Sequence, residues 1–346
     1  MRRPRWLRLV APDRRPMRLD VIIPTYNRQD LLPSTLESLL AAEVPAGLEV
    51  GITVVDNNST DGTRPVIESF QQRTGDRIQY VFERQQGRSH ALNAGVNATS
   101  GDLVGVIDDD EEIFPTWLKT AFEAFNTRRD LDFIGGPYEP RWAVTPPAWL
   151  PPEYGSVVGW VSGGEKELPF DKNYPGILMG GNAVFRREAL LKVGLYTTWL
   201  GRTDKGLLSG EDEDLYHRLL ASGARGMYLP SLKVYHHVGA ERLTRKYFRS
   251  WCLWRGVSLG LLERTRKQPV AYLFGVPRWQ YKTAARGLVS GLMGLVVSPK
   301  DERKAFASEL AFWDFVGMFY GRHFRRAPGP LETRGPAQMQ NTNSLT

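Results

Sequence analysis

The stretch Leu103–Asp110, which reads LVGVIDDD, places an apolar strand directly before three consecutive carboxylates. A short apolar run of this kind is typical of a strand that is buried on both faces of a parallel sheet. Adjacent carboxylates repel one another, and a hard divalent cation shared with a diphosphate resolves that conflict. A solvated acidic turn, continued by Glu111 and Glu112, explains the same pattern about equally well.

The sequence on either side of this stretch alternates strands with helices. We expect strands at 19–23 (ending at Pro24), 50–55, 78–82 and 103–107, with helices at 30–42 (Asp30 as N-cap), from 61–63 onward and at 89–98. Alternation with short connections predicts an open α/β sheet. Ligands bind at the carboxyl ends of the strands in such sheets. The polar clusters at 24–28, 56–61, 83–90 and 108–111 therefore predict one shared crevice.

A second acidic cluster, Gly210–Asp214, begins a predicted helix about 100 residues after the first. The helix dipole keeps a carboxylate at a helix N-terminus ionised, which suits a general base. The alternative is that Asp212 or Glu211 only caps the helix.

Polar residues at other strand ends are further candidates. Asp56 could accept hydrogen bonds from a base or a ribose, whereas Asn57, Asn58 and Ser59 could equally form an ordinary Asx turn with no ligand at all. Arg84 and Arg88 could neutralise phosphate or simply be solvated. One of His236 and His237 could be a neutral imidazole ligand of a metal, although such a pair at a strand end is more often structural.

The chain is basic, with a formal net charge of +7 and a pI of about 9.4. Positive charge gathers in the first 18 residues and in 242–267, which suits nucleotides, phospholipid headgroups or nucleic acid. The only cysteine, Cys252, excludes an intramolecular disulfide and a cysteine-based zinc site. No signal peptide and no apolar run of about 18 residues is present. We therefore expect a cytoplasmic protein, with attachment to the inner face of the cell membrane left open.

The chain is long enough for one large domain with an appendage. We expect a basic flexible tail at 1–17, a catalytic domain at 18–240, an aromatic-rich helical region at 241–325 and a disordered tail at 326–346. Residues 135–177, rich in Pro, Gly and Trp, predict a long irregular segment that covers a substrate. In 242–256, Lys246, Arg249 and Arg255 with Tyr247, Trp251 and Trp254 could close over a diphosphate, contact lipid, stack on single-stranded nucleic acid, or pack in the core. A last helix is expected from Ser298 as N-cap.

Taken in order, these segments resemble the inverting family 2 glycosyltransferases, which have a GT-A-type fold. The matching runs are VIIPTYNR at 21–28, VVDNNSTDGT at 54–63, GRSHALNAG at 87–95, IDDD at 107–110, GGNAVFRRE at 180–188 and GEDEDL at 210–215. The likeness covers about residues 18 to 240, and the ordered combination is far more specific than any one run.

The resemblance implies roles for individual residues. The residues that it implies bind the nucleotide and the donor are Pro24, Thr25, Tyr26, Asn27, Arg28, Asp56, Asn58, Arg84, Arg88, Asp108 and Asp109. Those implied to bind the sugar and the acceptor are Gly181, Asn182, Trp251 and Arg255. The implied metal ligands are Asp110, Asp108 and His237. Asp212 matches the catalytic base, with Glu211 supporting it. The implied reaction is inverting transfer from a nucleoside-diphosphate sugar to a glycan or lipid-linked acceptor, with Mn²⁺ or Mg²⁺ on the diphosphate.

One family pattern is missing. Processive synthases carry a Q-x-x-R-W motif, whereas the comparable region here is Trp251–Gly256 (WCLWRG). That difference favours single addition. A nucleotidyltransferase and a non-catalytic membrane- or nucleic-acid-binding protein are the rival classes. The dense acidic crevice argues against nucleic acid as a partner of the central domain.

Overall fold

The computed structural model describes residues 15–202, 206–265, 270–296 and 301–325. The predicted C-terminal tail and almost all of the predicted N-terminal tail lie outside the described residues, so both remain predictions. The division of the chain into two regions at residue 240 likewise remains a prediction.

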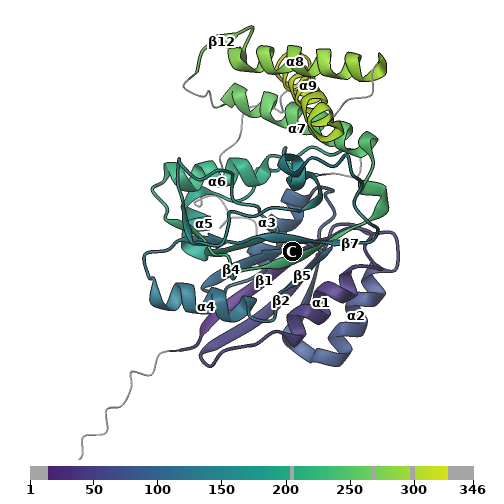
Figure 1. Ribbon diagram of the computed structural model, residues 1–346. Helices are drawn as coiled ribbons and strands as arrows, with labels where there is room; N and C mark the ends of the chain where they lie inside the picture. Colours follow the sequence, from purple (N-terminus) through teal and green to yellow (C-terminus); the bar gives the residue numbers. More distant parts are fainter. Residues whose placement is uncertain (1–14, 203–205, 266–269, 297–300, 326–346) are drawn as a thin grey trace, which may run out of the picture.

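An eight-stranded sheet forms the centre of the molecule, in the order β3-β2-β1-β4-β9-β6-β10-β8 (Figure 1). Its strands are β1 Met17–Thr25, β2 Leu48–Asp56, β3 Ile78–Phe82, β4 Leu103–Ile107, β6 Phe133–Gly135, β8 Leu168–Phe170, β9 Asn182–Arg186 and β10 Gly226–Tyr228. The first four are mutually parallel, β9 runs antiparallel to its neighbours, and β10 is parallel to β6. The predicted open, mostly parallel sheet is therefore confirmed.

Helices cover both faces of this sheet and create two separate cores. The helices are α1 Leu32–Ala41, α2 Thr63–Thr74, α3 Arg88–Ala98, α4 Trp117–Thr127, α5 Arg187–Val193 and α6 Glu211–Ala221. Apolar residues of α1, α2 and α4 pack on one face and those of α3, α5 and α6 on the other (Figure 1). Adjacent residues of β1 divide between them, with Val21 in the first core and Ile22 in the second, because successive side chains of a strand point to opposite faces.

A second, three-stranded sheet stands beside the first. It joins β5 Glu111–Ile113, β11 Val234–Val238 and β7 Tyr138–Trp142. The segment 135–177, predicted to be irregular, contains β7, β8 and a 3-10 helix at Pro152–Val158. These elements were not predicted, because prolines are frequent in the segment and each strand has only three to five residues.

Three predicted boundaries are wrong. Pro24 lies inside β1, paired with Val55; β4 pairs with β1 only as far as Ile22, so the missing N–H of Pro24 faces no partner strand. Asp30 is not an N-cap, since α1 begins at Leu32 with a proline in its first turn. The last helix is α9, Glu302–His323, and its N-cap is Asp301, which accepts a hydrogen bond from the Lys304 N–H at 3.1 Å. Ser298 lies outside the described residues.

The predicted C-terminal helical appendage is present. It comprises α7 Arg245–Thr265, a hairpin of β12 Tyr272–Leu273 and β13 Val276–Pro277, α8 Arg278–Val296, and α9. Helix α9 packs against both α7 and α8, and the three helices lie together at one end of the molecule (Figure 1). No helix among the described residues is long and apolar enough to cross a bilayer.

Candidate active site

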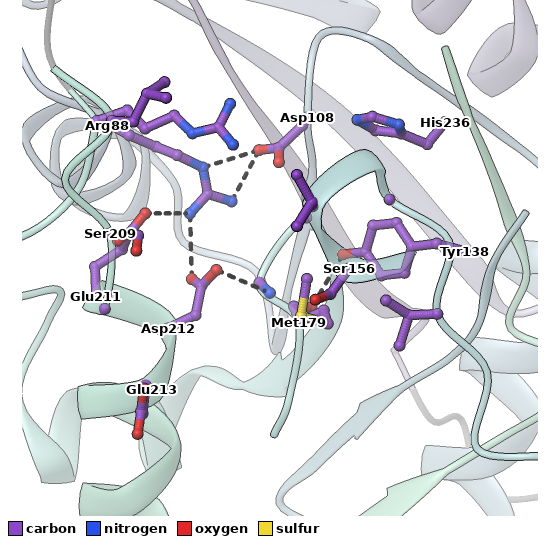
Figure 2. Close-up of a pocket in the computed structure, with 18 of the residues that line it drawn as sticks. Arg88, Asp108, Tyr138, Ser156, Met179, Ser209, Glu211, Asp212, Glu213 and His236 are labelled. Atoms are coloured by element: carbon purple, nitrogen blue, oxygen red, sulfur yellow. Dashed lines mark hydrogen bonds and ion pairs between the residues drawn. The ribbon is translucent and has the colours of Figure 1, made fainter. Parts of the chain in front are cut away.

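A cavity of about 870 Å³ opens where the parallel strands of the large sheet end. The loop after β1, the acidic run after β4, the start of α6 and one face of α7 all contribute to its wall. All four polar clusters predicted to share a crevice contribute to the lining, and three of them supply charged side chains. Figure 2 shows how the side chains converge from these separate segments.

Arg88 connects the two acidic clusters. Its Nη2 lies 2.8 Å from Asp108 Oδ1, and its Nη1 lies 3.1 Å from Asp212 Oδ1 and 3.2 Å from Glu211 Oε1 (Figure 2). The guanidinium is buried, and although burial opposes its charge, Asp108, Asp212 and Glu211 raise the pKa of Arg88 well above its usual value. One permanently charged side chain thus holds carboxylates that are more than 100 residues apart in the sequence.

Two consecutive glycines allow the backbone to approach both clusters closely. A Cβ at Gly180 would lie 1.9 Å from Asp212 Oδ1, and a Cβ at Gly181 would lie 2.5 Å from Asp108 Oδ2. The Gly180 N–H donates to Asp212 Oδ2 at 3.1 Å. Any side chain at these positions would displace a carboxylate, which explains why the chain has Gly-Gly here.

Asp109 organises the loop that follows β1. It accepts a hydrogen bond from the Tyr26 N–H at 3.3 Å, and its Oδ1 lies 3.4 Å from Arg28 Nε. Burial, followed by the charge of Asp110, raises the pKa of Asp109 to about 7. Pro24, Thr25, Tyr26 and Arg28 line the cavity. Asn27 does not; its side chain accepts a hydrogen bond from the Thr60 N–H at 2.8 Å.

Asp110 faces His236 and Arg242. Its Oδ2 accepts from Arg242 Nη2 at 2.7 Å, and its Oδ1 lies 3.6 Å from His236 Nε2. Burial favours the protonated acid, but His236 and Arg242 outweigh burial and lower the pKa of Asp110. Burial in turn lowers the pKa of His236, and its Nδ1 has no hydrogen-bond partner among the described residues.

The structure contradicts the placement of His237 beside Asp110. Its Nε2 lies 2.6 Å from Glu112 Oε1, outside the cavity. Side chains alternate along β11, so only one histidine of the pair can face the acidic cluster, and that one is His236. Backbone contact remains, since the His237 N–H donates to the Asp110 carbonyl at 2.8 Å.

Besides Asn27, three further predicted nucleotide contacts lie outside the cavity lining. Asp56 is buried, with Oδ1 accepting from the Ser59 N–H at 2.8 Å and Oδ2 from the Tyr80 hydroxyl at 3.0 Å. Asp56 therefore holds the loop that follows β2, where a turn of Asn57, Asn58 and Ser59 without a ligand was the alternative that the sequence left open. Asn58 and Arg84 are exposed and do not line the cavity. Asn57, which was not predicted, does line it; its side-chain oxygen accepts from the Gly87 N–H at 2.8 Å and so shapes the turn before Arg88.

Asn182 does not contact the cavity either. Its amide is fully buried, donating to the Leu232 carbonyl at 2.7 Å and accepting from Trp117 Nε1 at 2.8 Å. It is the first residue of β9 and points away from the cavity, whereas the neighbouring Gly181 lines it. Asn182 therefore joins the two sheets.

Helix α7 closes the far side of the cavity with Trp251 and Arg255. The Arg255 guanidinium lies 5.2 Å from the centre of the Trp251 ring, and its Nε donates to Asp314 of α9 at 2.9 Å. Among the lining residues that sequence reasoning missed are Tyr138, Arg202 and Arg242. Only Arg242 had a usable signal, since it begins the basic stretch that follows the last strand.

The acidic side chains are crowded enough to favour a divalent cation. Burial, together with Asp212, raises the pKa of Glu211 to about 7, and burial with Asp108 raises the pKa of Glu111 well above its usual value. Glu111 Oε1 and Glu211 Oε2 are buried and have no hydrogen-bond partner among the described residues. No three Asp, Glu or His side chains form a complete ligand set within the described ranges. These donors fit an ion that takes one or two carboxylates and completes its shell with substrate phosphates and water.

The sheet order and the acidic crevice at its strand ends define a GT-A-type enzyme. The mannosyltransferase PcManGT of Pyrobaculum calidifontis has a similar fold, with a TM-score of 0.59 at 20% identity over 90% of this chain and 88% of that one. The sequence profile of Glycosyl transferase family 2 matches residues 20–194, slightly more than half of the chain. The chain belongs to this family and is a glycosyltransferase, as the resemblance predicted.

Two relatives match across most of their length. A glucosyl-dolichyl phosphate glucuronosyltransferase of Haloferax volcanii is 27% identical over 252 residues, covering 71% of this chain and 78% of the relative. The succinoglycan biosynthesis protein ExoM of Rhizobium meliloti is 26% identical over 243 residues, covering 68% of this chain and 73% of the relative. Both alignments extend well beyond the matched family segment.

Proposed function

We propose that this glycosyltransferase moves a sugar from a nucleoside-diphosphate donor to a hydroxyl of a glycan or lipid-linked acceptor, with inversion at the anomeric carbon. The observation that carries the proposal is the contact of Arg88 with Asp108, Glu211 and Asp212 in one cavity. It brings a cation-binding cluster and a candidate base to the same space. The similarity to a glucosyl-dolichyl phosphate glucuronosyltransferase supports an acceptor of this class.

Asp212 is the proposed general base. Its side chain is about one-fifth exposed and lines the cavity, whereas Glu211 beside it is almost fully buried. Asp212 takes the proton from the acceptor hydroxyl, and that oxygen then attacks the anomeric carbon. The bond from this carbon to the diphosphate oxygen breaks, and the nucleoside diphosphate leaves with the electron pair. A single displacement inverts the configuration.

The proposed metal site uses Asp110 and Asp108, with His236 in the place expected for His237. The fit rests on the crowded carboxylates and on the buried ring of His236, whose Nε2 lies 3.6 Å from Asp110 Oδ1. When bound, Mn²⁺ or Mg²⁺ would supply positive charge to the departing diphosphate. PcManGT was solved with GDP-Man and Mn²⁺, which is the ligand class proposed here.

The cationic side chains have a separate part in the proposal. Arg28 and Arg242 each hold one carboxylate of the acidic run, and Arg88 holds Asp108 against the start of α6. These pairs keep the carboxylates oriented before the donor arrives. We assign the loop at 24–28 to the nucleotide, and Gly181, Trp251 and Arg255 to the sugar or acceptor.

The test of the base is the variant Asp212→Asn, assayed with a donor that the wild-type enzyme turns over. The amide cannot take a proton, so we expect kcat to fall by about 10²–10⁴-fold while Mn²⁺-dependent binding of the donor, measured by calorimetry, changes little. Glu123→Gln, an exposed carboxylate on α4, is the matched control and keeps full turnover. Turnover by Asp212→Asn equal to that of the control would refute the assignment.

A further inference from the structure

Helix α8 has an exposed face that carries positive charge and apolar side chains but no carboxylate. The helix contains Arg278, Lys282 and Arg286 and not a single Asp or Glu. These three basic side chains share the exposed face with Trp279, Ala285, Leu288, Val289, Leu292 and Met293. We call this set of nine residues the α8 face. Positions three and four apart recur in it, so it is one continuous side of the helix.

The two halves of the α8 face differ in character. The first two turns carry the three cations and Trp279, whereas the next two carry only apolar residues, with Leu292 and Met293 each more than half exposed. Apolar side chains in that number on one solvent-facing surface mark an interaction site. Helix α8 lies along the end of the molecule farthest from the parallel sheet (Figure 1), and its α8 face is exposed in the part of the chain that the structure describes.

The positive charges of the α8 face have no partner among the described residues. The carboxylates of the neighbouring α9 are engaged on its other side: Glu302 with Arg245 at 2.9 Å, Glu309 with Arg249 at 2.5 Å, and Asp314 with Arg255. These pairs join α9 to α7. The cations of α8 are therefore left to an external anion.

The hairpin before α8 adds an exposed aromatic tip. Phe274 is 73% exposed and has a φ of +46°, a conformation that is unfavourable for a bulky residue. Its backbone is held on both sides, since the Leu273 carbonyl accepts from the Tyr281 hydroxyl at 2.8 Å and the Phe274 carbonyl lies 2.7 Å from His323 Nε2. The fold thus presents a solvent-exposed phenyl ring, on a backbone held by two hydrogen bonds, next to the α8 face.

We propose that the α8 face and the Phe274 tip form a peripheral membrane-binding surface, which lies in the headgroup region of an anionic bilayer. Phosphate headgroups match the unpaired cations, and the acyl boundary accommodates Trp279, Phe274 and the apolar half. A second copy of the chain fits poorly, because a two-fold contact between α8 faces would set like charges together if the helices ran parallel and would bury cations against apolar side chains if they ran antiparallel. A nucleic acid would leave the apolar half in water.

The experiment is vesicle flotation of the full chain, with vesicles of phosphatidylcholine alone or mixed with phosphatidylglycerol. We expect binding to the mixed vesicles, weaker at high salt, and none to the neutral ones. The charge variant R278Q/K282Q/R286Q should lower binding by at least about tenfold, and V289S/L292S/M293S should also lower it. All these side chains are exposed, so both variants should keep the wild-type circular dichroism and melting temperature.

The matched control is R129Q/K166Q/K192Q, which removes three exposed basic residues from elsewhere on the chain. It should bind the mixed vesicles like the wild type. An equal loss in both charge variants would mean that overall positive charge drives the binding, and would overturn the proposal. So would an absence of binding to mixed vesicles, or light scattering that detects a dimer broken by V289S/L292S/M293S. None of these readouts depends on catalysis, so they stand apart from the proposed function.

Discussion

Arg88 lies in a cavity wall that is richer in carboxylates than in arginines. It contacts Asp108, Glu211 and Asp212, which reach it from two distant segments. Removing one partner of a buried ionic cluster costs more than removing an exposed pair, because the remaining charges stay buried without compensation. The stability of the whole site therefore depends on this residue.

We predict that Arg88→Gln lowers the free energy of unfolding by about 3 kcal/mol at neutral pH, measured by urea denaturation. Arg129→Gln, which removes an exposed arginine, should change it by less than about 0.5 kcal/mol. If the two variants unfolded at the same urea concentration, Arg88 would not neutralise the cluster in the way described.

The buried thiol of Cys252 leads to a second prediction about a single residue. It is fully buried in the core between α7 and α9, and burial raises the pKa of its thiol. The reactive thiolate is thus both scarce and shielded. The native protein should react with a disulfide reagent such as DTNB only at the rate of unfolding, and completely in urea. Native labelling as fast as that of free cysteine would contradict this packing.

Sequence reasoning located the acidic residues well but not all of their neighbours. Asp108–Asp110 and Asp212 were identifiable from their positions after a strand and at a helix start. The choice between His236 and His237 needed the register of β11, which a sequence pattern does not fix when both faces carry polar residues. Asn182 follows the cavity-lining Gly181 in the sequence, yet its side chain points away from the cavity and bonds Trp117 and the Leu232 carbonyl.

At the scale of elements, close helix contacts at glycine hold the C-terminal helices together. A Cβ at Gly317 of α9 would lie 1.9 Å from the Leu253 carbonyl of α7. At Gly291 of α8, by contrast, a Cβ would meet only Glu309 Cγ at 3.6 Å, an ordinary contact. The same substitution should therefore act in opposite directions at these two positions.

We predict that Gly317→Ala destabilises the protein by about 1–3 kcal/mol, because α9 must move away from α7. Gly291→Ala should be neutral or stabilise by up to about 1 kcal/mol, since alanine favours the helix. Thermal unfolding monitored by circular dichroism measures both. A melting temperature for Gly317→Ala at or above that of Gly291→Ala would show that the close contact is unimportant.

Most elements of the first half were predictable, because each strand is apolar and each helix has a regular buried stripe. The first four strands match to within two or three residues. The short strands β5 to β8 were not predictable, because three to five residues carry too little periodicity. The start of α1 was misread, since Asp30 and Pro33 are both helix-start signals and the proline determined the boundary.

At the scale of the molecule, the sequence predicted the fold class but not the order of the strands. Strand β9 inserts between β4 and β6 although it follows them in the chain. That order brings Gly180 and Gly181 against the carboxylates of both acidic clusters, which no local pattern reveals. The order of motifs along the chain was sufficient to predict the family, and the family match over residues 20–194 confirms that prediction.

The central claim is that this cavity binds a nucleoside-diphosphate sugar through a divalent metal. The most direct measurement is the release of nucleoside diphosphate from a panel of UDP-, GDP- and dTDP-sugars, with Mn²⁺ and with EDTA. We predict turnover of at least one donor with Mn²⁺, with nucleoside diphosphate as the product, and its loss in EDTA and in Asp110→Asn. Release of pyrophosphate, or no metal-dependent turnover or binding with any donor, would contradict the claim.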